Sequence, residues 1–151
     1  MKIYLGADHR GFELKNKVFA YLQKRGYDVE DVGNKELDPH DDSIQFAQAA
    51  ALKLIDKEHD TDRAILICGS GQNICMAANR FRGVRAVVAA TADDAHWGRR
   101  DNNANALCLS GRNFTNDDDQ FWQDIIDTFL NTEFAGFERY VRRNKLLDEL
   151  S

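Results

Sequence analysis

Apolar and polar positions along this 151-residue chain follow two alternating patterns. Short, continuous apolar runs are typical of strands buried on both faces of a parallel sheet, and the longer segments between them have helical spacing. In Gly11–Arg25, for example, apolar residues recur on one side, and Gly26 can end the helix. By the same criteria we expect strands at Lys2–Gly6, Tyr27–Val32, Arg63–Ile67, Val84–Ala90 and Ala106–Leu109, and further helices at Asp42–Lys57, Gly71–Arg80, Thr91–Asn102, Asp117–Asn131 and Thr132–Leu150.

Strands that alternate with helices predict an α/β fold, in which right-handed crossovers build a parallel sheet. The chain shows no repeat and no linker, so we expect residues 1–151 to form a single domain.

Composition narrows the functional classes. The chain is 43% hydrophobic and 30% charged, and it has no apolar run long enough to cross a membrane and no signal peptide, so we expect a cytoplasmic protein without a membrane partner. Its net charge of −5 argues against nucleic acid as a partner. The cysteines Cys68, Cys75 and Cys108 form no CxxC pair and have no companions at zinc spacing, which predicts reduced thiols and no metal site.

The segment Ala64–Asn73 is the strongest candidate for a functional site. Its apolar run stops at Cys68, and Gly69, Ser70 and Gly71 form a turn before the next expected helix. Open α/β sheets bind ligands at such turns, because glycines let the backbone approach an anion and the first N–H groups of a helix are unpaired. The pattern therefore predicts chemistry on a phosphorylated small molecule.

Several sequence blocks carry a resemblance to a known family. They are Gly6-Ala7-Asp8-His9-Arg10-Gly11-Phe12-Glu13-Leu14-Lys15, Asp31-Val32-Gly33, Cys68-Gly69-Ser70-Gly71, Ala77-Ala78-Asn79, Gly83-Val84-Arg85-Ala86, Asn102-Asn103-Ala104-Asn105 and Gly111-Arg112. In this order and spacing the chain resembles ribose-5-phosphate isomerase B and the galactose-6-phosphate isomerase subunits, from Lys2 to about Lys145.

The resemblance implies a Rossmann-like, three-layer α/β/α fold with a five-stranded parallel sheet. It also implies a homodimer, which can pair into a homotetramer, with active sites at the subunit interface. The implied reaction is aldose–ketose isomerisation of a phosphorylated sugar, with ribose 5-phosphate and ribulose 5-phosphate as the default pair, and it needs no metal or organic cofactor.

The resemblance also assigns roles to residues. Cys68 matches the base that moves a proton between C1 and C2, although a small buried core residue is the alternative for it. Ser70 supplies a hydroxyl to the substrate, or caps the turn. The remaining matches would bind substrate: Asp8 and His9 after the first strand, the backbone of Gly69, Gly71, Gln72 and Asn73, and Asn102 and Arg112.

Three departures from the family pattern affect these expectations. Asp101 stands where relatives have a histidine that helps to open the sugar ring; it can accept a proton but is a poor donor, and His96 is a speculative substitute. Asn73 replaces a glycine, and asparagine tolerates left-handed backbone angles, so the turn could survive. Ser43 replaces a tyrosine after Asp42, which leaves room for a six-carbon sugar.

The C-terminal helix, expected at about 132–150, should reach a partner subunit and supply two phosphate-binding arginines four residues apart. An ungapped count gives Glu138 and Arg142, whereas one inserted residue gives Arg139 and Arg143, which is the register we prefer because glutamate repels phosphate. Solvated charge at a helix end is the alternative for these arginines.

Together these features favour a sugar-phosphate isomerase with Cys68, Ser70 and Asp101 in the catalytic group. The alternatives are a hexose-6-phosphate isomerase of the allose or galactose type and a sugar-phosphate-binding protein without turnover. A nucleotide-binding domain is disfavoured because no GxGxxG fingerprint follows the first strand.

Overall fold

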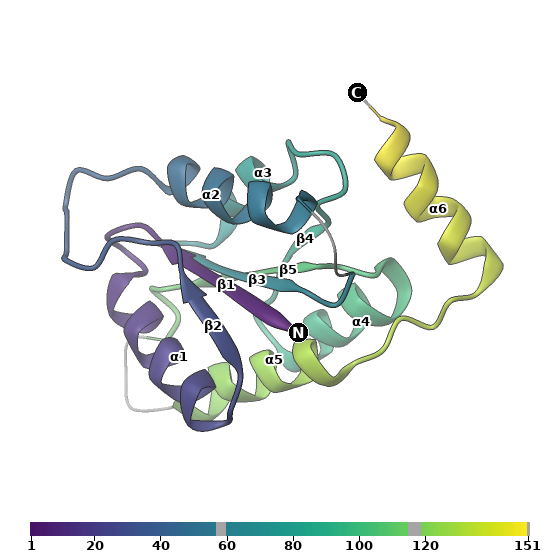
Figure 1. Ribbon diagram of the computed structural model, residues 1–151. Helices are drawn as coiled ribbons and strands as arrows, with labels where there is room; N and C mark the ends of the chain where they lie inside the picture. Colours follow the sequence, from purple (N-terminus) through teal and green to yellow (C-terminus); the bar gives the residue numbers. More distant parts are fainter. Residues whose placement is uncertain (57–59, 115–118, 151) are drawn as a thin grey trace.

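The computed structural model describes residues 1–56, 60–114 and 119–150, and it forms a three-layer α/β/α domain (Figure 1). The strands are β1 (Lys2–Ala7), β2 (Asp28–Asp31), β3 (Arg63–Cys68), β4 (Ala86–Val88) and β5 (Ala106–Ser110). The helices are α1 (Phe12–Lys24), α2 (Ser43–Ile55), α3 (Gln72–Ala78), α4 (Ala92–Asn102), α5 (Asp119–Asn131) and α6 (Glu138–Glu149). The predicted fold class is therefore confirmed. Among the described helices, none combines the length and the apolar character that crossing a membrane requires.

The five parallel strands lie in the order β2-β1-β3-β5-β4. The chain first moves outward from β1 to β2 and then returns to place β3 on the other side of β1, so the winding direction reverses between β1 and β3. Ligands of open α/β sheets bind in the crevice outside the carboxyl ends of the strands at this reversal. The topology thus directs attention to the residues after Ala7 and after Cys68.

Strand β3 is buried along its whole length because helices cover both faces of the sheet. Ile65 and Ile67 pack into the apolar cluster formed with α1, α4 and α5, whereas Ala64, Leu66 and Cys68 pack into the cluster formed with α2 and α3. Successive side chains of a strand point to opposite faces, which accounts for this division. Figure 1 shows α2 and α3 above the sheet and α1, α4 and α5 below it.

Two glycines allow the loops at the carboxyl edge to meet. A Cβ at Gly11 would lie 2.6 Å from the carbonyl oxygen of Ile67, at the end of β3, and a Cβ at Gly111 would collide with the carbonyl oxygen of Arg10. Both obstacles are backbone atoms, which cannot rotate away. The turn after β1 therefore lies directly against the ends of β3 and β5.

The expected single helix over Thr132–Leu150 is wrong in its first part, because residues 132–137 form an extended connection between α5 and α6. Gly136 has a positive φ of 65°, which interrupts the helical path. Contacts with α4 also hold the connection: Ala135 N donates to Arg100 O (2.9 Å) and Arg99 Nε donates to Thr132 O (3.3 Å). The expected starts of α5 at Asp117 and Asp118 lie outside the described residues.

Candidate functional site

The turn after β1 carries Asp8 and His9 at the carboxyl edge of the sheet. Asp8 Oδ1 accepts hydrogen bonds from Arg10 N (2.9 Å) and Gly11 N (3.2 Å), so this carboxylate shapes the turn as well as facing the edge. Burial raises the pKa of Asp8, and the two N–H groups and His9 oppose this without reversing it. The turn thus places a carboxyl group and an imidazole next to the point where the winding reverses.

Asp41 is a residue of this site that the sequence analysis missed. Its carboxylate is buried, and Oδ1 accepts from both His9 N (2.8 Å) and His9 Nδ1 (2.9 Å), while Oδ2 accepts from Asn34 Nδ2 (3.0 Å). Asp41 and His9 are 32 positions apart in the chain, and one acidic loop gives no signal for such a pairing. The neighbouring Asp42 occupies the N-cap position of α2, but its side chain makes no capping hydrogen bond.

The loop after β3 is fastened to the end of β5. Gly111 N donates to Cys68 O (2.8 Å), and Gly69 O accepts from both Ser110 Oγ (2.8 Å) and Arg112 N (3.2 Å). A Cβ on Gly69 would lie 3.3 Å from Arg112 Nε, so the guanidinium rests directly on this glycine. The structure therefore brings the predicted residues Cys68, Gly69 and Arg112 together.

Cys68 ends β3 and is 3% exposed, and its side chain lies on the α2–α3 side of the sheet. This burial matches the core-residue alternative, so a catalytic role for Cys68 depends on a substrate that seats directly on the loop. The other two cysteines pack nearby, where burial raises the pKa of the Cys108 thiol well above its usual range. Both thiols are buried, which suits the packing role expected of them.

The turn into α3 is left-handed at Gly71, with a φ of 76°, and Ser70 Oγ accepts a hydrogen bond from Gln72 N (3.2 Å). The turn is formed without a left-handed angle at Asn73, because Asn73 lies within α3 and, among the described non-glycine residues, only Asn103 has a positive φ. The Asn73 side chain instead accepts a hydrogen bond from Ser43 Oγ (2.5 Å). Two of the departures from the family pattern are thus joined across the mouth of the site.

The other predicted residues lie elsewhere. Asp101 and Asn102 end α4 close to the amino ends of the central strands, where Asn105 O accepts from Ala64 N. Ala64 lies at the amino end of β3 and Cys68 at its carboxyl end. Because β3 has six residues, Cys68 lies about 16 Å along the strand from the end of α4. A single chain therefore does not assemble the whole set.

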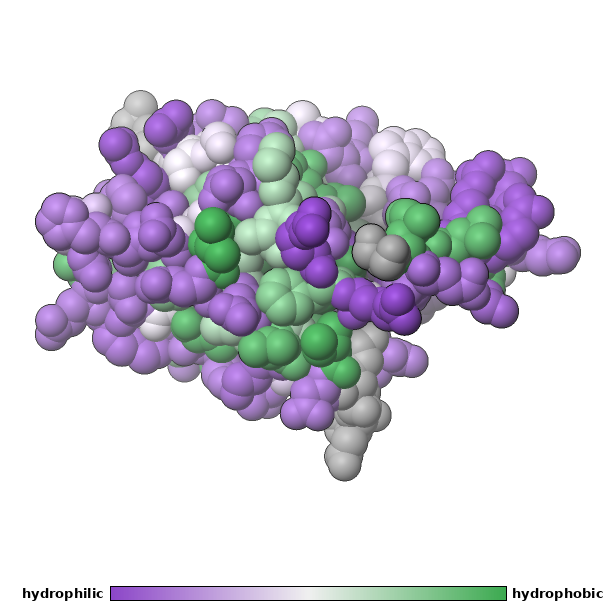
Figure 2. All heavy atoms as spheres, turned by 90° about the horizontal axis from the view of Figure 1, so that it is seen from above, coloured by the Kyte–Doolittle hydropathy of each residue, from purple (hydrophilic) through white to green (hydrophobic). Residues whose placement is uncertain are grey.

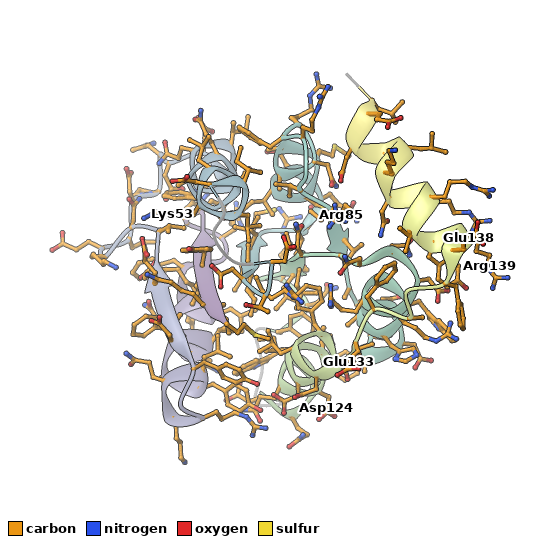
Figure 3. The ribbon with its side chains drawn as sticks, turned by 45° about the vertical axis from the view of Figure 1, so that its right-hand side comes forward. Lys53, Arg85, Asp124, Glu133, Glu138 and Arg139 are labelled. Carbon is orange, nitrogen blue, oxygen red and sulfur yellow. The ribbon has the colours of Figure 1, made fainter. Side chains whose placement is uncertain are left out.

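Arg139 and Arg143 lie on α6, on the side of the molecule where Asp101 is found and not near Cys68. Both guanidinium groups lie over the ring of Tyr140, at 4.8 and 5.9 Å from its centroid, so the two arginines share one side of α6. Hydrogen bonding to Tyr140 and the charge of Asp101 raise the pKa of Arg139. Asp101 itself is paired with Arg100 Nη1 at 2.6 Å. Figure 3 shows Arg139 at the beginning of α6, at the outer edge of the molecule.

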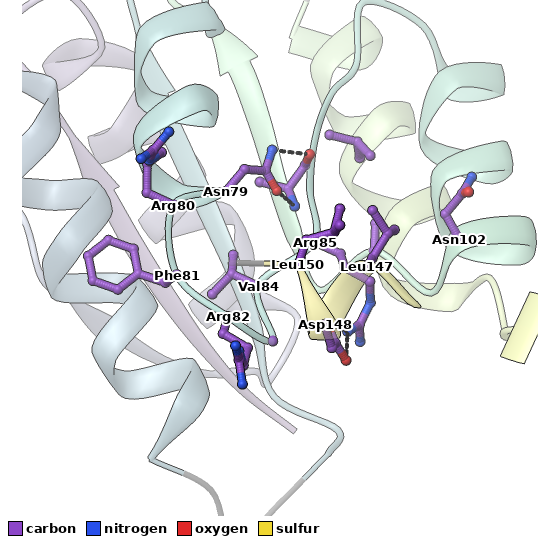
Figure 4. Close-up of a pocket in the computed structure, with 14 residues that line it drawn as sticks. Asn79, Arg80, Phe81, Arg82, Val84, Arg85, Asn102, Leu147, Asp148 and Leu150 are labelled. Carbon is purple, nitrogen blue, oxygen red and sulfur yellow. Dashed lines mark hydrogen bonds and ion pairs between the residues drawn. The ribbon is translucent and has the colours of Figure 1, made fainter. Parts of the chain in front are cut away.

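A cavity of about 660 Å³ lies between α6 and the connection from α3 to β4 (Figure 4). Asn79, Arg85, Asn102 and Leu147 are among its lining residues, and Arg85 Nη1 crosses it to both carboxylate oxygens of Asp148 (3.2 Å). Its lining includes neither Cys68 nor the loops after β1 and β3, so this cavity is separate from the place where those loops meet.

The arrangement divides the chemistry into two half-sites. The carboxyl-edge half-site holds a thiol, loop N–H groups, an imidazole and one arginine, which suit proton transfer beside a bound anion. The α4–α6 half-site holds Asp101, Asn102, Arg139 and Arg143, which suit polar and anionic groups. Among the residues that the structure describes, no group of three or more His, Cys, Asp or Glu gathers as a metal site would require.

Comparisons with known proteins agree with the geometry. The profile of the family described as "Ribose/Galactose Isomerase" matches residues 3–147. "Probable ribose-5-phosphate isomerase B" of Mycoplasma genitalium is 37% identical over 145 residues, which cover 96% of this chain and 93% of that protein.

Solved structures give the same result. Ribose-5-phosphate isomerase B of Clostridium thermocellum has a TM-score of 0.89 and 37% identity, with 99% of this chain and 96% of that chain covered. The M. genitalium enzyme, solved with bound ribulose 5-phosphate, has a TM-score of 0.87 and 36% identity, with 97% and 93% covered.

Proposed function

Because the chain belongs to the Ribose/Galactose Isomerase family, we propose that it interconverts ribose 5-phosphate and ribulose 5-phosphate through an enediolate. The observation that carries this proposal is the junction at the end of β3. There Cys68 is followed directly by a glycine loop on which the Arg112 guanidinium rests. A base, N–H donors and a phosphate ligand within one loop pair are what such an isomerisation requires.

In the proposed mechanism the Cys68 thiolate removes the proton from C2 of the open-chain aldose. Electrons from the broken C–H bond form the C1–C2 double bond, and the charge moves to the C1 oxygen, where loop N–H groups from Gly69 to Asn73 and the Ser70 hydroxyl stabilise it. After a proton moves between the two oxygens, C1 takes up a proton from the Cys68 thiol and the ketose is formed. Arg112 holds the phosphate by charge-assisted hydrogen bonds.

The two half-sites support a homodimer in which each active site takes residues from both subunits. A two-fold axis would place α4 and α6 of one subunit, with Asp101, Asn102, Arg139 and Arg143, over the carboxyl-edge loops of the other. Asp101 would then face the substrate in the place where relatives have a histidine.

Exposed apolar side chains support the same assembly. Figure 2 looks down on α2 and α3 and shows apolar surface on that face. The exposed apolar residues of these two helices are Ile44, Leu52, Ile55 and Met76. Helix α6 also exposes apolar residues: Phe137, Val141, Leu146, Leu147 and Leu150 lie on it or next to it. Patches of this kind mark association surfaces, and α6 of a second copy would cover the α2–α3 face.

Replacement of the thiol tests the reaction. We expect Cys68→Ala to lower kcat for ribose 5-phosphate by about 10²- to 10⁴-fold, the range for loss of a general base. Cys75→Ala is the matched control, because it removes a buried thiol from the same side of the sheet. Full turnover by Cys68→Ala would end the assignment of the base, while absence of turnover in the unmodified protein would end the isomerase proposal.

Mixing of subunits tests the shared site. Cys68→Ala and the double variant Arg139→Ala/Arg143→Ala should each be inactive alone. In their mixed dimer one site keeps both the thiol and the arginines, so an equal mixture should recover about a quarter of full activity. No recovery, with exchange of subunits verified by mass, would contradict a site shared in this way.

A second candidate function is a sugar-phosphate-binding protein without turnover. The burial of Cys68 and the ion pair of Asp101 with Arg100 favour it, because both groups are engaged within the chain. Thermal shifts with ribose, allose and galactose phosphates, measured beside coupled isomerase assays, separate the candidates: stabilisation without turnover of any of these sugars would favour binding alone. The same panel tests hexose 6-phosphates as substrates.

We infer a cytoplasmic location, which the free state of all three cysteines supports because cytosolic thiols are kept reduced. Interconversion of ribose and ribulose phosphates would place the protein in pentose phosphate metabolism.

A further inference from the structure

The carboxylate of Asp41 lies behind the His9 ring and is buried: 2% of the Asp41 side chain is exposed, whereas 29% of the His9 side chain is. One oxygen, Oδ1, accepts from the His9 backbone N–H and from ring Nδ1 at 2.8 and 2.9 Å. A carboxylate oxygen accepts but does not donate, so Nδ1 must carry the hydrogen of this contact. The ring nitrogen left for a ligand is Nε2.

The carboxylate is itself held from behind. Asn34 Nδ2 donates to Asp41 Oδ2 (3.0 Å), and the Asn34 carbonyl accepts from Lys15 Nζ (2.8 Å), which also binds Asp31 (2.6 Å). Lys15 belongs to α1 and Asp31 ends β2, so two elements of the fold fix the loop that carries Asn34. Asp41 therefore cannot follow the His9 ring, and the ring takes its direction from Asp41.

The exposed edge of His9 belongs to the carboxyl-edge half-site. Arg10 follows His9 in the chain, and its carbonyl oxygen lies so close to Gly111 that a Cβ at this glycine would collide with it. Arg112 is the residue after that glycine. An imidazole with Nδ1 occupied on a buried carboxylate presents Nε2 in one orientation, and such partners set both the tautomer and the direction of a ring.

We propose that Asp41 is a positioning residue, which holds His9 in the Nδ1–H form so that Nε2 accepts a hydrogen bond from a hydroxyl group of the sugar phosphate. The proposal rests on the proposed function for the identity of the ligand, and on the contacts of Asp41 alone for the state of the ring. Asp41 does not touch substrate; it acts through His9. Loss of the carboxylate frees the ring to rotate and to take up the Nε2–H form that an unrestrained neutral histidine favours.

Three variants test this inference. Asp41→Ala removes the acceptor, Asp41→Asn keeps an acceptor of the same size without the charge, and Asp42→Asn is the matched control, because Asp42 is the exposed neighbour and makes no capping bond. Nitrogen-15 spectra of the imidazole rings, with His9→Gln used for assignment, report the tautomer in the absence of substrate. Steady-state kinetics with ribose 5-phosphate report KM and kcat separately.

We expect the Nδ1–H form of His9 in the unmodified protein and in Asp42→Asn, and its loss in Asp41→Ala. Removal of an oriented substrate ligand raises KM more than it lowers kcat, so KM should rise about 10-fold in Asp41→Ala with kcat changed by less than about 3-fold. Asp41→Asn should fall between the two, and it supplies the result if the alanine variant does not fold.

An unchanged tautomer in both Asp41 variants would overturn the inference, as would equal effects of Asp41→Asn and Asp42→Asn on KM. The readouts also separate this inference from the proposed function. If Asp41→Ala loses the Nδ1–H form but the unmodified protein turns over no sugar phosphate, the role of Asp41 is supported and the isomerase proposal is refuted. If the unmodified protein is active and Asp41→Ala has an unchanged KM, the isomerase proposal is supported and the role of Asp41 is refuted.

Discussion

The ion pair of Lys15 and Asp31 is a buried charged contact whose loss should affect both the stability of the domain and its site. Lys15 is 1% exposed, and its ammonium group lies 2.6 Å from Asp31 Oδ2 and 2.8 Å from the Asn34 carbonyl. Lys15→Met keeps the length and apolar character of the side chain but leaves the Asp31 carboxylate without its buried partner. Removal of one member of a buried pair costs about 3–5 kcal/mol.

The position of Asp31 places the expected loss near the lower end of this range. Its carboxylate keeps the hydrogen bond from Gly33 N (2.8 Å) and a contact with Lys35 Nζ (3.3 Å), although the Lys35 side chain is largely exposed. We therefore expect Lys15→Met to lower the free energy of unfolding by about 3 kcal/mol at neutral pH, as measured by urea unfolding.

The pH dependence gives the sign of the effect. Burial works to raise the pKa of Asp31, but hydrogen bonds from Lys15 Nζ and Gly33 N outweigh it and hold the pKa below the ordinary value of 3.8. A carboxyl group whose pKa is lowered by folding stabilises the fold above its unfolded pKa, and this contribution is lost as the pH falls through the lower folded value. The difference between Lys15→Met and the unmodified protein should thus be full at pH 7 and shrink below about pH 4.

Lys17→Met is the matched control for this experiment. Lys17 lies on the same helix and pairs with Asp119 at 3.2 Å, but both side chains are exposed, by 40% and 46%. Exposed pairs contribute at most about 1 kcal/mol, so this variant should change little. Equal losses in the two variants, or a Lys15→Met loss that does not diminish at low pH, would refute the reasoning.

Two further predictions concern the edges of the site. Gly111→Ala forces a Cβ into the Arg10 carbonyl, so it should displace the turn that carries His9 and reduce turnover. We expect it to destabilise the domain by about 1–3 kcal/mol in thermal unfolding. An unchanged melting temperature would show that the two loops are not in contact. Ser43→Ala removes the hydrogen bond to Asn73, which should cost about 0.5–1.5 kcal/mol, and a double-mutant cycle with Asn73→Gly should give a coupling energy of that size rather than zero.

Local patterns were sufficient for the sheet and for the loop after β3. The apolar run from Ala64 to Ile67 predicts a strand buried on both faces, and Cys68 with its glycines marks the end of that strand, because both features depend on neighbouring residues alone. The break between α5, which ends at Asn131, and α6, which begins at Glu138, was also marked in the sequence by Gly136. The prediction missed it because the charged residues around Gly136 continue the helical pattern, and only contacts with α4 reveal the extended path.

Contacts between distant segments could not be predicted from one sequence. Asp41 and His9 meet because the loop after β2 folds back over the turn after β1, and nothing in either segment specifies the other. Similarly, Ser43 and Asn73 are each unusual for the family, but their hydrogen bond follows from the way α2 lies beside α3. To predict that Asp101 lies far from Cys68, the direction in which α4 runs relative to the sheet would also have to be known.

The way α6 is fastened has a consequence for the response of this protein to salt. Its first two turns are held by Tyr140 and Asn144, which are buried, and its last turn by the ion pair of Asp148 with Arg85, whose side chains are 39% and 15% exposed. Added electrolyte screens an exposed ion pair and leaves apolar contacts intact or strengthened. As ionic strength rises, we expect the carboxyl end of α6 to separate from Arg85, while the buried contacts of Tyr140 and Asn144 keep the rest of the helix in place.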